Sequence, residues 1–209
     1  MPRITTVLLD RDGTIIEDKH YLSKPEGVKL LPGVADSLSH LTKLGIRLFV
    51  VSNQSGIGRG MFPREAADAV NKRMSELLQA KGVTLTDIIY CPHAPEAGCN
   101  CRKPSLGMWQ ALQKAYGIKP EETMMIGDKE EDILFGANAN LALRGLVLTG
   151  KGPATAASLE IILPRKGACI HFVDSPDVPR YPHLVLSSFF QLDEVVRLLS
   201  MRQGWSCGA

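Results

Sequence analysis

The chain has 209 residues, of which 44% are hydrophobic and 22% are charged, proportions typical of an ordinary globular protein with one sizeable core. A formal net charge of +2 excludes a strongly basic surface, so nucleic acid is not an expected partner. No run of about 18 apolar residues is available to cross a membrane, and no signal peptide precedes the first expected strand, which predicts a cytoplasmic protein that does not bind membranes.

The first strong pattern is a short apolar run that ends in two carboxylates. Val7-Leu8-Leu9 is typical of a buried parallel strand rather than a helix, and Asp10-Arg11-Asp12-Gly13 follows at once. Residues two apart in an extended backbone point to the same side. Asp10 and Asp12 can therefore face one site at the carboxyl end of the strand, where open parallel sheets bind ligands. This favours a metal and phosphate site, with a turn of two solvated aspartates as the alternative.

A loop, a helix and a second strand are expected next. Residues 15–31 combine charged and aromatic side chains with proline and glycine, which predicts a loop over the same sheet edge. Apolar residues at helical spacing predict a helix over 33–44, and an apolar run predicts a strand over 46–51. The loop carries three polar residues of interest, Asp18, His20 and Tyr21.

Polar and glycine-rich residues follow the second strand. The stretch Ser52-Asn53-Gln54-Ser55-Gly56-Ile57-Gly58-Arg59-Gly60 offers hydroxyls, amides and three glycines at the same sheet edge as Asp10. Side-chain donors and backbone amides of this kind suit a loop around a phosphate, although a flexible turn is an equal alternative from this stretch alone. Apolar periodicity then predicts a helix that begins at Pro63 and ends near Lys81, and a third strand over 87–90.

Four candidate metal ligands lie together just after the third strand. Cys91-x-His93 is followed, after five residues, by Cys99-x-Cys101, which provides three thiolates and one imidazole for a closed tetrahedral Zn²⁺ site. Four protein ligands leave no position for a substrate, so we expect a structural zinc. It would order the loop and direct the next residues, Arg102 and Lys103, to the site. The alternative is a chance cluster of buried, reduced thiols.

The rest of the chain continues the alternation of helices and strands. Another carboxylate pattern, Gly127-Asp128 with Asp132, follows a predicted strand and so reaches the same sheet edge. Five alternations predict an α/β fold, a three-layer Rossmann-like sandwich with a mostly parallel central sheet. The expected elements are a helix at 107–116, a strand at 123–126, a helix at 133–140 and a strand at 145–148.

The carboxyl-terminal part is less regular. Two further strands at 168–173 and 184–187, and a closing amphipathic helix at 192–199, are expected. No repeat or linker divides the chain, so we expect a single domain over residues 1–202 and a disordered tail at 203–209.

Together these motifs resemble the haloacid dehalogenase superfamily of aspartate-nucleophile phosphohydrolases. The four signatures occur in order, as Asp10-Arg11-Asp12-Gly13-Thr14, Ser52-Asn53, Lys103, and Gly127-Asp128 with Asp132. The stretch from Asn53 to Gly60 and the cysteine cluster are most similar to the zinc-loop branch of heptose 1,7-bisphosphate 7-phosphatases and histidinol phosphatases. That branch has no large cap domain, which agrees with the 39 residues between Asp12 and Ser52 and the 50 between Ser52 and Lys103.

The resemblance implies an enzyme and assigns roles to its residues. Asp10 would attack phosphorus and form an aspartyl phosphate, while Asp12 protonates the leaving oxygen and later takes a proton from water. Ser52 and Lys103 would hold the phosphate oxygens. The implied Mg²⁺ ligands are oxygens of Asp10, of the Asp12 backbone carbonyl and of Asp128, with Asp132 next to these ligands rather than among them.

The substrate is less sharply defined by the sequence. The Asn-Gln-Ser-Gly-Ile pattern followed by Arg-Gly is that of the heptose phosphatases, whereas the short spacer between His93 and Cys99 is shared with histidinol phosphatases. We favour a heptose bisphosphate as the small-molecule partner of a monomeric enzyme. Histidinol phosphate, or binding of a phosphorylated ligand without turnover, remains open. Candidate substrate contacts are Asp18, Tyr21, Asn53, Gln54, Ser55, Arg59, Arg102 and Lys129.

Overall fold

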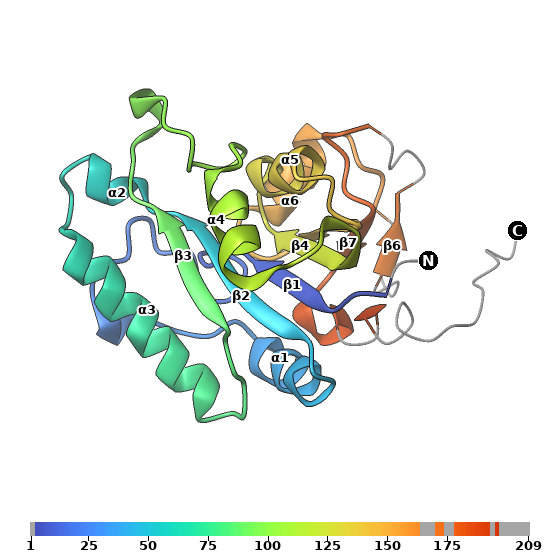
Figure 1. Cartoon of the computed structure of the whole chain (residues 1–209), viewed down its shortest axis with the longest axis horizontal. Coiled ribbons are helices and arrows are strands. Elements are labelled where there is room, and N and C mark those ends of the chain that lie inside the picture. Colours follow the sequence, from blue (N-terminus) through green and yellow to red (C-terminus); the bar gives the residue numbers. More distant parts are fainter. Residues whose placement is uncertain (1–2, 164–169, 174–177, 193–194, 197–209) are drawn as a thin grey trace, which may run out of the picture.

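The computed structural model describes residues 3–163, 170–173, 178–192 and 195–196. Within these ranges, seven strands form one sheet, and Figure 1 shows their arrangement. They are β1 (Thr6–Leu9), β2 (Arg47–Asn53), β3 (Asp87–Cys91), β4 (Thr123–Gly127), β5 (Leu143–Val147), β6 (Ile170–Phe172) and β7 (Leu184–Leu186). Their order is β3-β2-β1-β4-β5-β7-β6, and neighbouring strands are parallel except for the antiparallel pair β6 and β7.

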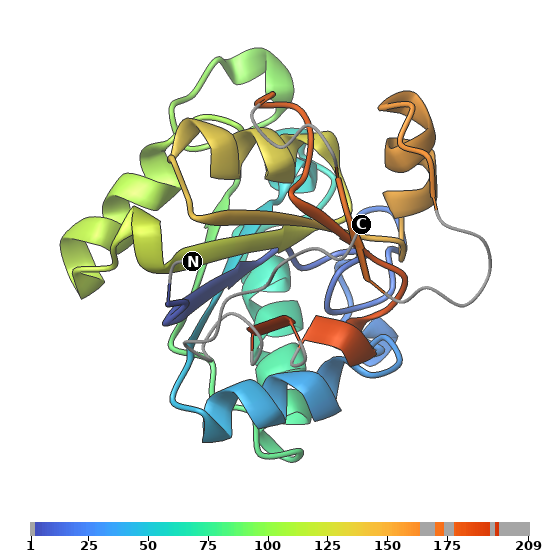
Figure 2. The same cartoon turned by 90° about the vertical axis from the view of Figure 1, so that its right-hand side faces the viewer.

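Helices cover both faces of the sheet, which makes three layers (Figure 2). The longer helices on one face are α1 (Val34–Lys43) and α3 (Arg64–Gln79), and those on the other are α4 (Gly107–Tyr116), α5 (Glu130–Asn138) and α6 (Gly152–Ser158). A one-turn helix, α2, spans Ser55–Gly58. Short 3-10 helices span η1 (Pro25–Gly27), η2 (Pro95–Ala97), η3 (Pro120–Glu122) and η4 (Phe189–Gln191).

The alternation of side chains along the central strand explains the two apolar layers. Val7 and Leu9 pack with the core residues of α1 and α3, whereas Leu8 packs with those of α4 and α5. All three side chains are fully buried, because a parallel strand in a three-layer sandwich is covered on both faces. The predicted α/β class, a three-layer Rossmann-like sandwich with a mostly parallel sheet, is confirmed.

The strand order creates a crevice at the end of β1. From β1 the chain adds β2 and β3 on one side, and β4 and β5 on the other. Leu9 is in register with Val50 of β2 and Ile126 of β4, so the next residue, Asp10, lies at the point where the order reverses. Ligands of open α/β sheets bind at such switch points.

Several predicted boundaries need correction. The glycine-rich stretch is not simply a loop, because Ser52 and Asn53 extend β2 and the helix α2 follows. Pro63 precedes α3 as its N-cap rather than forming its first residue. Helix α5 begins at Glu130 instead of residue 133, because the side chain of Asp132 accepts a hydrogen bond from the backbone N–H of Lys129 and caps the helix.

The carboxyl-terminal part contains two elements that the sequence did not predict, helix α6 and the short 3-10 helix η4. Helix α6 was not predicted, whereas strands β6 and β7 were expected and are present. The predicted helix at 192–199 lies for the most part outside the described residues, as does the tail at 203–209. Within the described ranges, no helix is both long and apolar enough to cross a membrane.

Candidate active site

Asp10 lies at the centre of the site, directly after β1. Its backbone N–H donates to the carbonyl of Ile126 in β4 at 2.9 Å, and the residue is 3% exposed. Oδ1 accepts a hydrogen bond from Lys103 Nζ at 2.7 Å, while Oδ2 is buried without a hydrogen-bond partner among the described residues. One oxygen is therefore held by a cation, and the other is available to a ligand.

Lys103 lies between two buried carboxylates. Besides Asp10, its Nζ contacts Asp132 Oδ1 at 2.5 Å and donates to the Val51 carbonyl at 2.6 Å, which uses all three donors of the ammonium group. Asn53 holds the backbone of Lys103 from both sides, since its Oδ1 accepts from the Lys103 N–H at 2.9 Å and its Nδ2 donates to the carbonyl at 3.1 Å. Asn53, predicted as a substrate contact, thus also positions Lys103.

The carboxylate of Asp12 is oriented by two buried polar side chains. Arg11 Nε donates to Asp12 Oδ2 at 3.0 Å, and Arg11 Nη2 lies 2.9 Å from the same oxygen. Gln54 Nε2 donates to Asp12 Oδ2 at 2.9 Å and to Ser52 Oγ at 2.8 Å. Since Ser52 Oγ accepts this bond, its own proton remains available for an anion. Gln54 therefore connects two residues to which the sequence assigns catalytic roles.

Asp128 follows β4 and is enclosed by glycines. Its Oδ2 accepts a hydrogen bond from the Lys151 N–H at 2.8 Å. A Cβ atom on Gly13 would lie 2.1 Å from this oxygen, and one on Gly150 would lie 2.4 Å from it, and both glycines have positive φ angles, +84° and +51°. Only glycine tolerates this combination of close approach and left-handed backbone. Thr149 Oγ1 donates to the Gly13 carbonyl at 2.6 Å and ties the two segments together.

The charged side chains around Asp10, which are Lys103, Asp128, Lys129 and Asp132, shift one another's pKa values. Burial would raise the pKa of Asp10, but the positive charges of Lys103 and Lys129 outweigh it and lower that pKa below its usual range. Burial, followed by repulsion from Asp10, raises the pKa of Asp128 to about 7. Burial also raises the pKa of Asp132 to about 6 against the attraction of Lys103. The cluster holds more negative charge than its two lysines neutralise, which favours a further cation.

The donor set of this cluster fits Mg²⁺. Carboxylate oxygens of Asp10, Asp128 and Asp132 all lie within 4.8 Å of one another. Asp10 Oδ2 and Asp128 Oδ1 are buried and lack hydrogen-bond partners in the described part of the chain, and Lys129 Nζ lies 3.8 Å from each. Buried carboxylate oxygens without partners are costly, and a hard divalent cation takes oxygen ligands of this kind.

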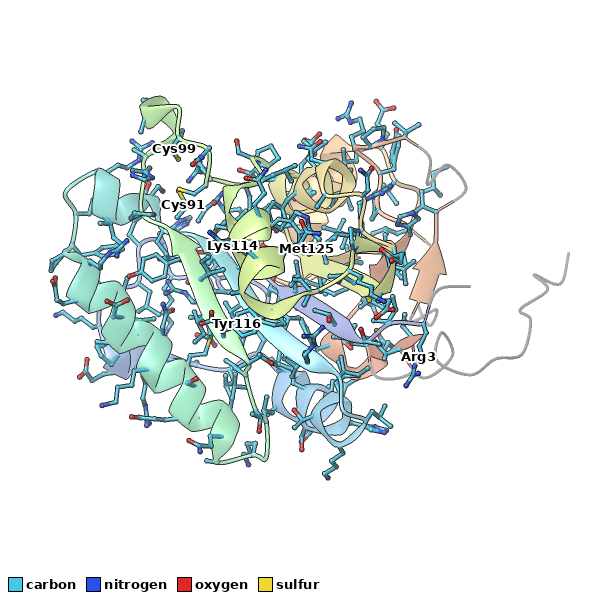
Figure 3. The ribbon with its side chains drawn as sticks, in the orientation of Figure 1. Arg3, Cys91, Cys99, Lys114, Tyr116 and Met125 are labelled. Carbon is cyan, nitrogen blue, oxygen red and sulfur yellow. The ribbon has the colours of Figure 1, made fainter. Side chains whose placement is uncertain are left out.

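The cysteine and histidine side chains predicted to bind zinc also converge. Cys91 ends β3, Cys99 lies in the loop that follows (Figure 3), and His93 and Cys101 complete the group. One ligand atom from each residue lies within 4.8 Å of the others, with Cys101 Sγ 2.9 Å from Cys91 Sγ and 3.2 Å from His93 Nδ1. Three sulfurs and one nitrogen in such a cluster fit a tetrahedral metal ion such as Zn²⁺.

The loop that carries this thiol cluster is hydrogen-bonded to Gln54 and to helix α2, which follows Gln54. Gln54 N–H donates to the Cys91 carbonyl at 2.7 Å, and Gly58 N–H donates to the Pro92 carbonyl at 2.8 Å. A Cβ atom on Gly58 would lie only 2.5 Å from the backbone nitrogen of Ala94, so α2 packs directly on the loop. The conformation of this loop therefore bears on Gln54 on one side and on Lys103, two residues after Cys101, on the other.

A cavity of about 220 Å³ opens over these residues. Of the predicted site residues, those that line it are Asp10, Asp12, Asp18, Tyr21, Asn53, Gln54, Ser55, Arg102, Lys103, Lys129 and Asp132, together with His20. Ser52 and Asp128 are not among the described residues that line it, but each contacts a residue that does, Gln54 and Lys129 respectively. Arg59 is also absent from that lining and instead pairs with Glu96 at 3.2 Å.

Sequence reasoning missed several residues of the site. Arg11 and Lys151 line the cavity, and Asn71 of α3 accepts a hydrogen bond from Arg11 Nη1 at 2.8 Å. The position of Arg11 between two aspartates gives a weak signal, because strand alternation predicts that its side chain points away from theirs, whereas in the structure its guanidinium contacts Asp12. The sequence gives no signal for Asn71, since this residue is 60 positions away from Arg11.

A parallel sheet with carboxylates, a buried lysine and a hydroxyl at one edge defines a hydrolase of the haloacid dehalogenase class, and comparisons with known proteins agree. The HAD-hydrolase-like family model matches residues 100–168. A D-glycero-beta-D-manno-heptose-1,7-bisphosphate 7-phosphatase of Photorhabdus laumondii is 39% identical over 161 residues, which cover 74% of this chain and 86% of the relative. That of Haemophilus influenzae is 37% identical, over 83% of this chain and 94% of the relative.

A solved structure extends this similarity to the whole fold. The D,D-heptose 1,7-bisphosphate phosphatase from B. bronchiseptica, complexed with magnesium and phosphate, superposes with a TM-score of 0.75 at 27% identity, over 93% of this chain and 99% of that one. The chain belongs to the family of D-glycero-beta-D-manno-heptose-1,7-bisphosphate 7-phosphatases, a family of haloacid dehalogenase-like phosphatases. The family resemblance seen in the sequence is thereby confirmed.

Proposed function

We propose that this phosphatase removes the 7-phosphate of D-glycero-D-manno-heptose 1,7-bisphosphate through an aspartyl phosphate on Asp10. The observation that carries the proposal is the cluster of Asp10, Asp12, Lys103 and Asp128 at the switch point of the sheet. The names of the relatives support the substrate, and they specify the β anomer at carbon 1, which is the form to test first.

Two carboxylates with different surroundings support a two-step reaction. Asp10 attacks phosphorus, and a bond from its carboxylate to phosphorus forms as the bond to the sugar oxygen breaks. Asp12 gives its proton to the departing oxygen. It then takes a proton from water, whose oxygen attacks phosphorus and releases inorganic phosphate from Asp10.

Other residues stabilise the charge that develops on the transferring group. The hydroxyl of Ser52 holds a non-bridging oxygen of this group. The three donors of Lys103 are used by Asp10, Asp132 and Val51, so Lys103 acts through its positive charge, which offsets the charge on the transferring group and keeps Asp10 ionised. Asp10, the backbone carbonyl of Asp12 and Asp128 would hold Mg²⁺, and Asp132 lies beside them as the second partner of Lys103. When bound, Mg²⁺ neutralises phosphate charge that would otherwise repel the attacking carboxylate.

Zn²⁺ in the thiol cluster has a structural role in this proposal. Four protein ligands, Cys91, His93, Cys99 and Cys101, would fill the four positions that Zn²⁺ usually offers and would leave none for substrate. The ion orders a loop whose ends contact the Gln54 backbone and lead into Lys103. Loss of zinc is therefore expected to displace Lys103, although the zinc ion itself does not contact the substrate.

Arg102 is the best candidate to bind the second phosphate of the substrate. It lines the cavity, and its Nη1 is buried without a hydrogen-bond partner in the described part of the structure. The two other cations considered from the sequence have other partners, since Arg59 pairs with Glu96 and Lys129 lies near Asp10 and Asp128. A guanidinium with an unused donor suits a phosphate.

The test compares three phosphate esters with Mg²⁺ present: the β-heptose 1,7-bisphosphate, histidinol phosphate and 4-nitrophenyl phosphate. The heptose substrate should exceed both others in kcat/KM by at least about tenfold, since a site built for specific polar groups rejects substrates that lack them. Asp10→Asn should abolish phosphate release, whereas Asp36→Asn, at an exposed carboxylate on α1, should not. Equal and poor turnover of all three esters would contradict the substrate, and a fully active Asp10→Asn would contradict the nucleophile.

A further inference from the structure

A polar residue on the buried face of α3 needs explanation. Asn71 is 7% exposed and lies among the apolar residues Val70, Met74 and Leu78, which pack α3 against the sheet. A buried amide costs free energy unless it is hydrogen-bonded, and an apolar side chain would pack this face at no such cost. The partner of Asn71 is Arg11, whose Nη1 donates to Asn71 Oδ1 at 2.8 Å.

Arg11 is a buried cation with every nitrogen engaged. The residue is 1% exposed. Its Nε contacts Asp12, its Nη1 contacts Asn71, and its Nη2 contacts Asp12 and donates to Gln54 Oε1 at 2.8 Å. A guanidinium is a rigid plane, so fixing Nη1 fixes the direction of the Nε and Nη2 edge that faces Asp12.

The two carboxylate oxygens of Asp12 differ in the number and the length of their hydrogen bonds. Oδ2 receives Arg11 Nε at 3.0 Å, Arg11 Nη2 at 2.9 Å and Gln54 Nε2 at 2.9 Å. Oδ1 receives Arg11 Nη2 at the longer distance of 3.3 Å. Oδ2 is thus held by three donors, whereas Oδ1 is the less constrained oxygen of the carboxylate. In the two-step reaction proposed above, Oδ1 is the oxygen left to face the leaving oxygen and water.

We propose that Asn71 is a positioning residue for the acid and base chemistry of Asp12, and that it acts by anchoring the guanidinium of Arg11. The proposal rests on the proposed phosphatase function and deepens it. Because Asn71 is neutral, it fixes Arg11 without adding a second carboxylate that would compete with Asp12 for the guanidinium. Loss of this anchor lets the guanidinium rotate and misplaces Oδ1 relative to the leaving oxygen.

Substrates with different leaving groups distinguish a positioning role of Asn71 from a general contribution of Asn71 to protein stability. A sugar alkoxide needs a proton from Asp12 to depart, whereas 4-nitrophenolate departs without one. The value of kcat/KM reports the steps up to release of the leaving group, so it senses the acid step in the first substrate and not in the second. The ratio of the two kcat/KM values in one sample also cancels the fraction of enzyme that is correctly folded.

The test measures this ratio in the full-length, zinc-loaded enzyme with Mg²⁺ for the wild type, Asn71→Leu and Asn71→Ser. Both variants should lose roughly tenfold or more in kcat/KM with the heptose bisphosphate, since a misplaced catalytic group costs up to about a hundredfold. With 4-nitrophenyl phosphate the loss should stay below about threefold, while slower deprotonation of water lowers kcat and produces a burst of nitrophenol. The control is Met74→Ala, which weakens the same helix face without touching Arg11.

The outcomes discriminate between the two proposals. Equal losses with both substrates in both Asn71 variants, or no loss at all, would overturn the positioning role while leaving the phosphatase function intact. A change of the same size in the ratio for Met74→Ala would overturn it as well. A wild-type enzyme that hydrolyses neither ester would overturn the proposed function itself, and this is visible before any variant is made.

Discussion

Replacing Lys103 by methionine should strongly destabilise the protein, because two buried carboxylates lose their shared cation. Nζ lies 2.7 Å from Asp10 Oδ1 and 2.5 Å from Asp132 Oδ1, and each of the three residues is at most 3% exposed. Removing one partner of a buried ion pair costs about 3–5 kcal/mol, a large part of a typical stability of about 5–15 kcal/mol. With a urea slope of roughly 2–3 kcal/mol per molar, the unfolding midpoint should fall by about 1–2.5 M.

The compensating variant tests the cause of this loss. Asp132→Asn in the Lys103→Met background removes one of the two unpaired charges, so it should recover at least about 1 kcal/mol, a coupling typical of residues in direct contact. Asp10 keeps Lys129 at 3.8 Å. The double variant should nevertheless stay inactive, because the cation that faces the transferring phosphate is still missing.

The assay is urea unfolding followed by circular dichroism, with zinc retained and no Mg²⁺ added. Lys119→Met is the matched control, since Lys119 is exposed and pairs with Glu122 at the surface, and its midpoint should hardly change. A shift for Lys103→Met no larger than that of this control would refute the reasoning. So would a further loss of stability when Asp132→Asn is added.

Three other predictions concern the ions and the second phosphate. Gly13→Ala, whose Cβ would lie 2.1 Å from Asp128 Oδ2, should weaken Mg²⁺ binding by at least about tenfold in calorimetric titration. Gly45→Ala, at a similar φ but with no described atom within 4 Å of the added Cβ, should not weaken it. Equal effects of the two substitutions would contradict the conclusion that Gly13 is needed for the close packing around Asp128. Arg102→Met should raise KM for the heptose bisphosphate by about tenfold and leave that for 4-nitrophenyl phosphate unchanged, whereas the exposed Arg73→Met should alter neither; an unchanged KM argues against a phosphate contact. Removal of zinc by a mercurial reagent should abolish activity until Zn²⁺ is returned, and full activity in zinc-free protein would exclude the structural role.

The parts of the fold that the sequence predicts well are those with a local signal. The apolar run before Asp10, the periodicity of α4 and the spacing of the four thiol-cluster ligands each depend on neighbouring residues alone. These elements were predicted with at most small shifts at their ends. The carboxylates of Asp10, Asp12 and Asp128 could be grouped because parallel strands end at one sheet edge.

The missed elements lack such a local signal. Helix α6 consists of Gly152–Ser158, a stretch of small residues without an apolar stripe, and it is held by tertiary contacts such as the hydrogen bond from Thr155 Oγ1 to the Asp128 carbonyl at 2.9 Å. Helix α5 starts with charged residues, and its first turn is recognised only through the Lys129 and Asp132 cap. The hydrogen bond between Arg11 and Asn71 joins elements 60 residues apart, which no spacing rule predicts.

The most direct test of the proposed chemistry is to trap the phosphorylated enzyme. Asp12→Asn removes the group that takes a proton from water, so the enzyme should react with 4-nitrophenyl phosphate, whose leaving group needs no acid, and then stall as the aspartyl phosphate. Acid quench, proteolysis and mass spectrometry should find one phosphoryl group on the peptide that contains Asp10, and none when Asp10→Asn is added. A stalled enzyme phosphorylated at another residue, or steady phosphate release without any phosphorylated enzyme, would contradict Asp10 as the nucleophile.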